Sequence, residues 1–190
     1  MDDLHLLTLL AVRLRGRGDA EAVRSTVGDL VGDASVSIGV AMESATGLEQ
    51  VRTRGDEGRV SLTEAGRAEL DAYLAADTDV AGRADLVTVY EAFLPTNRDF
   101  LGACVGWQDG DVDLADLADI VARLDPILDR LIELRTRFSS YQPRFEAALD
   151  QSATDPRWVD SPRFDSIHTI WFELHEHLLA TLGRDRTSER

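Results

Sequence analysis

The sequence predicts a mainly α protein with a single two-stranded β-hairpin near its N-terminal third. Two observations predict this class. Apolar residues recur at three- and four-residue spacing over most of the 190 residues, which is the spacing of amphipathic helices. Between Leu48 and Arg67 this spacing gives way to two short extended runs around a glycine-rich turn. An all-helical remainder follows, so we expect two domains, residues 1–76 and residues 77–190, with a boundary near Asp77–Gly82.

Three short helices are expected before the hairpin, over residues 3–15, 19–27 and 33–46. Asp19 and Asp33 are the residue type that caps a helix N-terminus. Glycines at 28 and 32 predict a turn between the second and third helices. Gly47 stands where a glycine commonly ends a helix.

The hairpin is predicted from two strands, Val51–Arg54 and Arg59–Leu62, joined by the turn Gly55–Gly58. Thr63 can then cap a helix that runs to Ala76. The strands carry three arginines in an otherwise acidic chain: Arg52, Arg54 and Arg59.

Four further helices are expected in the second half, over residues 80–107, 112–137, 143–152 and 161–182. Pro95 and Pro126 could each divide the helix that contains it, because a proline restricts the residue before it. Ser161 and Pro162 fit the cap and first position of the last helix, and Gly183 fits its end. Residues 155–160 are expected to form a loop, and residues 184–190 a polar tail.

The amino-acid composition limits the classes of function that this chain can have. The net charge is −15, and all 20 basic residues are arginine, so nucleic acid is repelled by most of the surface and could be bound only through a local positive patch. No apolar run approaches the ~20 residues of a membrane span, and the acidic N-terminus lacks the positive region of a secretory signal. With one cysteine, Cys104, an intramolecular disulfide is impossible. We therefore expect a cytoplasmic protein that does not enter a membrane.

The N-terminal layout resembles the MarR-like winged-helix transcription regulators of actinobacterial type. The resemblance covers about residues 4–76, and it rests on Gly47–Leu48, on Arg52, and on the run Val60–Arg67. It implies an N-terminal winged helix-turn-helix with a two-stranded wing, followed by a helical dimerisation and effector domain. It also implies a homodimer that binds promoter DNA, because paired winged helices contact two half-sites.

For DNA, the expected contacts come from the third helix and the wing. The residues are Ser35, Ser37, Ser44, Arg52, Arg54 and Arg59. Further arginines at 13, 15, 17 and 24 lie in a segment that the fold could bring to the same side. The third helix, however, contains no Arg, Lys, Asn or Gln, the residue types that usually discriminate bases. The alternative is a winged-helix protein without DNA readout that acts as a protein-interaction or small-molecule-binding module.

The second half offers a candidate pocket for a small apolar effector. Its candidate residues are Tyr90, Trp107, His168, Trp171 and His175, although ordinary core and dimer packing is the favoured explanation of such aromatics. The histidines of the last helix lack the order of a known zinc motif, so no metal or other cofactor is expected. Neither a phosphate loop nor a nucleophile elbow occurs, and we expect no enzymatic activity. Cys104 is expected to be a buried small hydrophobe rather than a reactive thiol.

Overall fold

A computed structural model describes residues 4–16, 18–56, 58–77 and 80–184. It confirms a mainly helical protein with one small antiparallel sheet of two strands. The chain divides into two compact units, Met1–Asp79 with Glu176–Arg190, and Val80–His175. The division falls inside the last helix, which the sequence did not indicate. Among the described residues, no helix is both long enough and apolar enough to cross a bilayer.

In its described residues, the first unit contains four whole helices and the end of the last helix of the chain, packed around an aliphatic core. The whole helices are α1 (Leu4–Arg15), α2 (Ala20–Val31), α3 (Gly39–Gly47) and α4 (Glu64–Ala76). The central helix is α1, in which every residue from Leu7 to Val12 is buried. Core positions on the other elements include Val23, Leu70 and Ala180. The hydrophobic effect thus holds the short helices around α1, since helices of this length are marginal alone.

The predicted boundaries of α2 and α3 were wrong. Helix α2 continues through Gly28 and ends at Gly32, which has a left-handed φ of 71°. Helix α3 begins at Gly39 rather than at Asp33. The Asp33 carboxylate accepts hydrogen bonds from the backbone N–H and the hydroxyl of Ser35, so it closes a local turn instead of capping a helix.

The end of α3 also differs from the prediction. A glycine was expected at the left-handed position, but that conformation falls on Glu49, with a φ of 55°. The Gln50 N–H donates to the Ala45 carbonyl and the Glu49 N–H to the Thr46 carbonyl. These two bonds form a Schellman motif, which satisfies carbonyls that the helix end leaves open.

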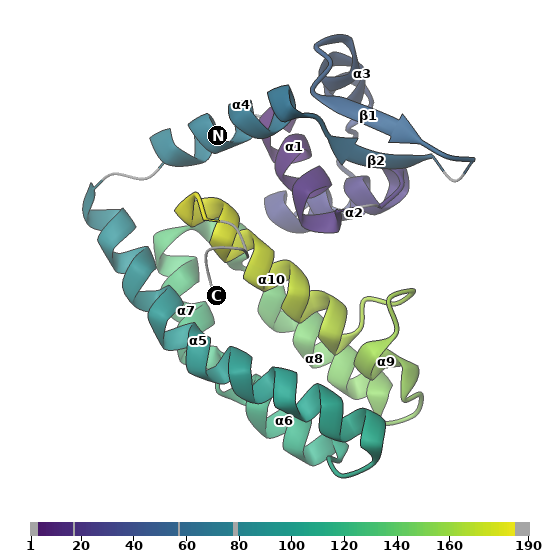
Figure 1. Cartoon of the computed structure of the whole chain (residues 1–190), viewed down its shortest axis with the longest axis vertical. Coiled ribbons are helices and arrows are strands. Elements are labelled where there is room, and N and C mark those ends of the chain that lie inside the picture. The colour runs from purple at the N-terminus through teal and green to yellow at the C-terminus, as the bar shows by residue number, and fades with distance from the viewer. Residues whose placement is uncertain (1–3, 17, 57, 78–79, 185–190) are drawn as a thin grey trace. The chain divides into compact units, whose positions relative to one another are not determined.

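The hairpin consists of β1 (Val51–Arg54) and β2 (Arg59–Leu62), as the sequence predicted to the residue. Val51 pairs with Leu62 and Thr53 with Val60. Val51, Val60 and Leu62 are buried, so this face of the ribbon packs on the helical core. Figure 1 shows the ribbon extending from the helices of this unit.

Two contacts fix the hairpin to its neighbours. The Val60 N–H donates to the Gly18 carbonyl over 2.9 Å, which ties β2 to the segment after α1. Thr63 caps α4 by accepting from the Gly66 N–H, and its hydroxyl donates to the Glu49 carbonyl at 2.6 Å. The threonine therefore locks the start of α4 to the end of α3.

The second unit consists of helices alone among its described residues. They are α5 (Val80–Asp109), α6 (Leu114–Ala122), α7 (Asp125–Leu134), a 3₁₀ turn (Thr136–Phe138), α8 (Tyr141–Ser152), α9 (Arg157–Asp160) and the first part of α10 (Ile167–Leu182). Helix α5 runs through Pro95 without a break, because buried side chains on both sides of the proline hold it in place. The break between α6 and α7 does fall just before Pro126, as the sequence allowed.

The last helix starts later than predicted. Residues 161–165 turn instead of starting the helix, and the Ser166 hydroxyl accepts from the Thr169 N–H as the cap. Just before this helix, the Asp165 carboxylate accepts hydrogen bonds from Nε and Nη2 of Arg144 on α8. The loop expected over residues 155–160 contains the single turn α9. Gly183 ends α10 with a φ of 64°, which confirms that prediction.

Candidate nucleic-acid interface

The strand register places three arginines on the face of the hairpin opposite the core. Arg52 lies across from Ser61, and Arg54 lies across from Arg59. Residues directly opposite in an antiparallel pair share a face, and residues two apart on a strand do as well. All three arginines are exposed. We name this surface the arginine face, defined by Arg52, Arg54, Arg59 and Ser61.

Within the described residues, no carboxylate pairs with Arg52 or Arg54 of the arginine face. The Arg52 Nε donates to the Ser61 hydroxyl at 3.3 Å, which orients the guanidinium without cancelling its charge. Arg54 and Asp56 form no ion pair within the part of the chain that the structure describes. Like charges directly opposite on a ribbon are unfavourable.

The helical arginines do not extend this patch. Arg13 is buried and binds Asp71 at 2.8 Å and Glu176 at 3.0 Å. The Arg15 Nε donates to the Thr26 hydroxyl, and Arg24 binds Glu21 and the Ala34 carbonyl. These three arginines are therefore engaged by partners within the helical unit, and whether they also face DNA stays a prediction. Arg17 lies outside the described residues.

The exposed side of α3 is apolar and acidic. Ala41 and Ala45 pack into the core, whereas Glu43 and Ser44 are exposed. The apolar Val40 side chain on this side is 83% exposed. This side therefore offers the hydroxyls of Ser44 and Thr46 and the apolar Val40 side chain to a partner, together with the Glu43 carboxylate, which repels phosphate.

The three predicted serines fall into different positions. Ser44 lies on α3 itself. Ser35 and Ser37 precede α3, in the turn that Asp33 closes, and both are exposed. The Ser35 hydroxyl is already donated to Asp33, which leaves only its lone pairs for another partner. Whether these serines contact DNA stays a prediction.

A shallow, open hollow lies beside the arginine face, between the end of α3, β1 and the start of α4. Its lining residues are Thr46, Leu48, Glu49, Val51, Arg52, Thr63, Glu64 and Ala65. Arg52 is the one cation among them, and Glu49 and Glu64 oppose it. Anion binding is thus favoured on the arginine face rather than in this hollow.

The residues expected to form an effector pocket lie in the core of the second unit or beside it. Tyr90, Trp171 and His175 are buried, and Phe93 lies within 6.4 Å of each ring. Trp171 stacks on Phe100 and donates from Nε1 to the Asn97 amide oxygen at 2.9 Å. His168 stacks 6.4 Å from Phe100, and Trp107 is half-buried near the end of α5. Aromatic packing accounts for these contacts, and their role with an effector stays a prediction.

A buried ion cluster holds α8 against the start of α10. Arg144 binds Glu173 at 2.9 Å and Asp165 at 2.8 Å, and Tyr141 lies under its guanidinium. Burial by itself lowers the pKa of Arg144, but the two carboxylates outweigh it and hold that pKa well above its ordinary value. The cluster is a structural element, because both carboxylates are already neutralised.

Two further kinds of chemistry concern the described residues, a reactive thiol and a metal site. Burial raises the pKa of the Cys104 thiol to about 11, and the nearby Asp160 carboxylate adds to the shift. No group of three or more His, Cys, Asp or Glu side chains in the described ranges is arranged to hold a metal ion.

One hollow in the second unit was missed by sequence reasoning. It lies between α6, the start of α7 and α8, and Asp125, Gln142 and Glu146 are its polar lining residues. Helical spacing was the only signal, since Gln142, Glu146 and Leu149 fall on one side of α8. That spacing cannot show which other helices pack against this side of α8.

Comparison of the chain with protein-family models, with curated proteins and with solved structures gives no match. The functional assignment therefore depends on the residues and geometry described above.

Proposed function

We propose that this chain is a MarR-like winged-helix transcriptional regulator that binds double-stranded promoter DNA as a homodimer. The observation that supports it best is the arginine face, where three guanidinium groups share one side of an anchored hairpin. In this proposal the first unit is the winged helix, the hairpin is its wing, and α3 is its recognition helix. No catalytic role is proposed for any residue.

In the proposed complex, the arginine face binds the phosphate backbone. Guanidinium groups form bidentate hydrogen bonds with phosphate oxygens, and they can also enter a narrow minor groove. Arg54 and Arg59 lie at the hairpin tip, where they can reach furthest. Backbone contacts position a protein on DNA but carry no sequence information directly.

Base recognition is expected to be weak in this proposal. Ser44 and Thr46 are the exposed hydroxyl residues of α3, and the Thr46 hydroxyl donates to the Met42 carbonyl. Val40 can contact a thymine methyl group. Sequence preference would therefore depend chiefly on DNA shape and on the spacing of two half-sites in a dimer, about 34–36 Å apart.

The test is a fluorescence titration of the purified chain against DNA from upstream of its own coding region, at about 50 and 200 mM salt. The proposal expects saturable binding at low salt that weakens strongly at high salt. Arg52→Gln/Arg54→Gln should remove most of this affinity. The matched control is Arg98→Gln/Arg163→Gln, which removes two exposed arginines from the second unit and should leave affinity nearly unchanged. Absence of binding at low salt by the folded chain would contradict the proposal.

A second candidate function is a protein-interaction or small-molecule-binding module on the same fold. It is favoured by the exposed side of α3, where Val40 and Glu43 stand in place of basic residues, and by the adjoining Leu48, which is 60% exposed. Leu48→Ser separates the two candidates, because Leu48 takes no part in the proposed DNA contacts. DNA binding should tolerate this change, whereas binding at an apolar docking surface would be weakened by it.

A further inference from the structure

The cavity between α6, α7 and α8 has the properties of a binding site for a small ligand. Its volume is about 150 Å³, and it opens to solvent on one side. An apolar cavity of roughly this volume accommodates a benzene-sized group. The floor is apolar, and its lining residues are Ala118, Val121, Ala122, Leu128, Phe145 and Leu149.

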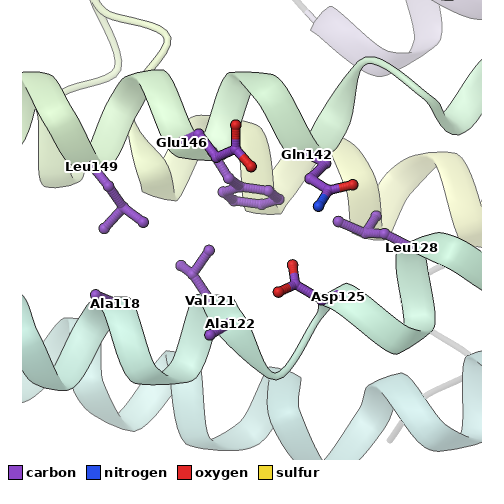
Figure 2. Close-up of a pocket in the computed structure, with 9 residues that line it drawn as sticks. Ala118, Val121, Ala122, Asp125, Leu128, Gln142, Glu146 and Leu149 are labelled. Atoms are coloured by element: carbon purple, nitrogen blue, oxygen red, sulfur yellow. The ribbon is translucent and has the colours of Figure 1, made fainter.

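Three polar side chains stand at this cavity, and two of them are carboxylates. Figure 2 shows Asp125 at the start of α7 pointing toward Gln142 on α8, with Glu146 one turn further along α8. Within the part of the chain that the structure describes, neither Asp125 nor Glu146 forms an ion pair or a hydrogen bond. The polar groups of the cavity are therefore available to a ligand.

The nearby arginines do not neutralise these carboxylates, because each is committed elsewhere. Arg123, two residues before Asp125, binds Asp99 at 2.7 Å. Arg130 on α7 binds Asp85 and Glu133, at 3.0 and 2.6 Å. Arg144, two residues before Glu146, is held in the buried cluster with Asp165 and Glu173. The mouth of the cavity thus keeps two uncompensated negative charges beside an apolar floor.

From this geometry we propose that the cavity binds a small organic ammonium ion whose apolar part is a single ring or a short branched alkyl group. The apolar part occupies the floor, and the ammonium group lies between Asp125 and Glu146. The Gln142 amide oxygen supplies a further acceptor for an ammonium N–H. A carboxylate or phenolate ligand would be repelled at the mouth, and a neutral one would gain nothing from the two charges. The proposal does not depend on DNA binding, because every residue that carries it lies in the second unit.

The experiment is isothermal titration calorimetry with 2-phenylethylammonium chloride and the full chain. The neutral comparison is 2-phenylethanol, and the anionic comparison is 3-phenylpropionate. We expect saturable binding of the cation at one site per chain and no saturable binding of the other two. Asp125→Asn and Glu146→Gln should each weaken binding about three- to tenfold, the effect of losing one partly exposed charge pair.

Matched controls separate a site from the general acidity of the chain. Asp129→Asn on α7 and Asp150→Asn on α8 remove the same charge from exposed positions that do not line the cavity, and they should leave binding unchanged. Ala118→Leu, which fills the floor, should abolish binding while the thermal unfolding curve shows a folded chain. If that variant fails to fold, the two carboxylate variants carry the test. The proposal is overturned if the cation shows no saturable binding, if 2-phenylethanol binds equally well, or if the control variants weaken binding as much as Asp125→Asn and Glu146→Gln.

Discussion

At the residue scale, the junction between the hairpin and α4 depends on a close approach of two backbones. Gly66 lies against Gln50, and a Cβ atom there would overlap the Gln50 carbonyl, lying 2.8 Å from its carbon. Thr63 supplies the cap and the bond to Glu49 at the same place. The Leu-Thr-Glu-Ala-Gly sequence at 62–66 thus has a structural reason that is independent of any ligand.

Gly66→Ala is expected to lower the free energy of unfolding by about 2–3 kcal/mol, because the new methyl group forces α4 away from Gln50. Gly47→Ala is the control, since a Cβ atom at Gly47 meets nothing within 4 Å. Urea denaturation of both variants measures the difference. Equal stability of the two variants would show that α4 does not pack on Gln50 as described.

Cys104 provides a residue-scale test that depends on pH. Because burial raises the pKa of its thiol to about 11, the thiolate is scarce at neutral pH. We expect iodoacetamide to alkylate Cys104 at least about tenfold more slowly at pH 8 than it alkylates a cysteine peptide. The rate should rise toward pH 11, and folding should lose stability there, since the folded state holds this proton more tightly than the unfolded one. Equal rates for protein and peptide at pH 8 would contradict the burial of the thiol.

At the scale of elements, the hairpin was predictable and the helix starts were not. The strands Val51–Arg54 and Arg59–Leu62 follow from local signals, a turn with glycines at 55 and 58 and a capping threonine after it. The start of α3 did not follow, because Asp33 can bond either to a helix N-terminus or to its own local turn, and the sequence contains both options. The start of α10 depended on Arg144 reaching Asp165 from another helix, 21 residues earlier in the chain.

The two candidate sites, like the elements, differ in whether the sequence alone predicts them. The arginine face was predictable, because strand alternation alone places Arg52 and Arg54 on one side. The cavity at Asp125 and Glu146 was not, because it requires the packing of α6 and α7 on α8. The engagement of Arg13 in an ion pair with Asp71 likewise depends on contacts between distant segments.

The Arg144 cluster gives a test at the element scale. Arg144→Leu leaves Glu173, which is 3% exposed, without its partner, and should lower the free energy of unfolding by about 3–5 kcal/mol. Arg144→Leu/Glu173→Leu removes both charges and should recover a large part of that loss. A double-mutant cycle by chemical denaturation measures the coupling. Additive effects of the two single changes would mean that the pair does not interact in the folded state.

At the scale of the whole molecule, the distribution of charge decides how the proposed regulator could bind DNA. The net charge of −15 repels nucleic acid at long range, and the arginine face is the local positive patch that opposes this in the proposal. Affinity should therefore be modest and strongly dependent on salt. The homodimer of the proposal matters for the same reason, because the wing of the second protomer supplies a second set of these arginines and so doubles the number of phosphate contacts.

The salt dependence of DNA binding tests the central claim, that the arginine face provides the phosphate contacts, most directly. The measurement is the slope of log K against log salt for the wild-type chain, for Arg52→Gln/Arg54→Gln and for Arg98→Gln/Arg163→Gln. Each lost phosphate contact lowers the magnitude of the slope by about 0.9. We predict that the wing variant loses about 1.8 from the slope for each protomer bound, and that the control keeps the wild-type value. Equal slopes for all three proteins would contradict the account.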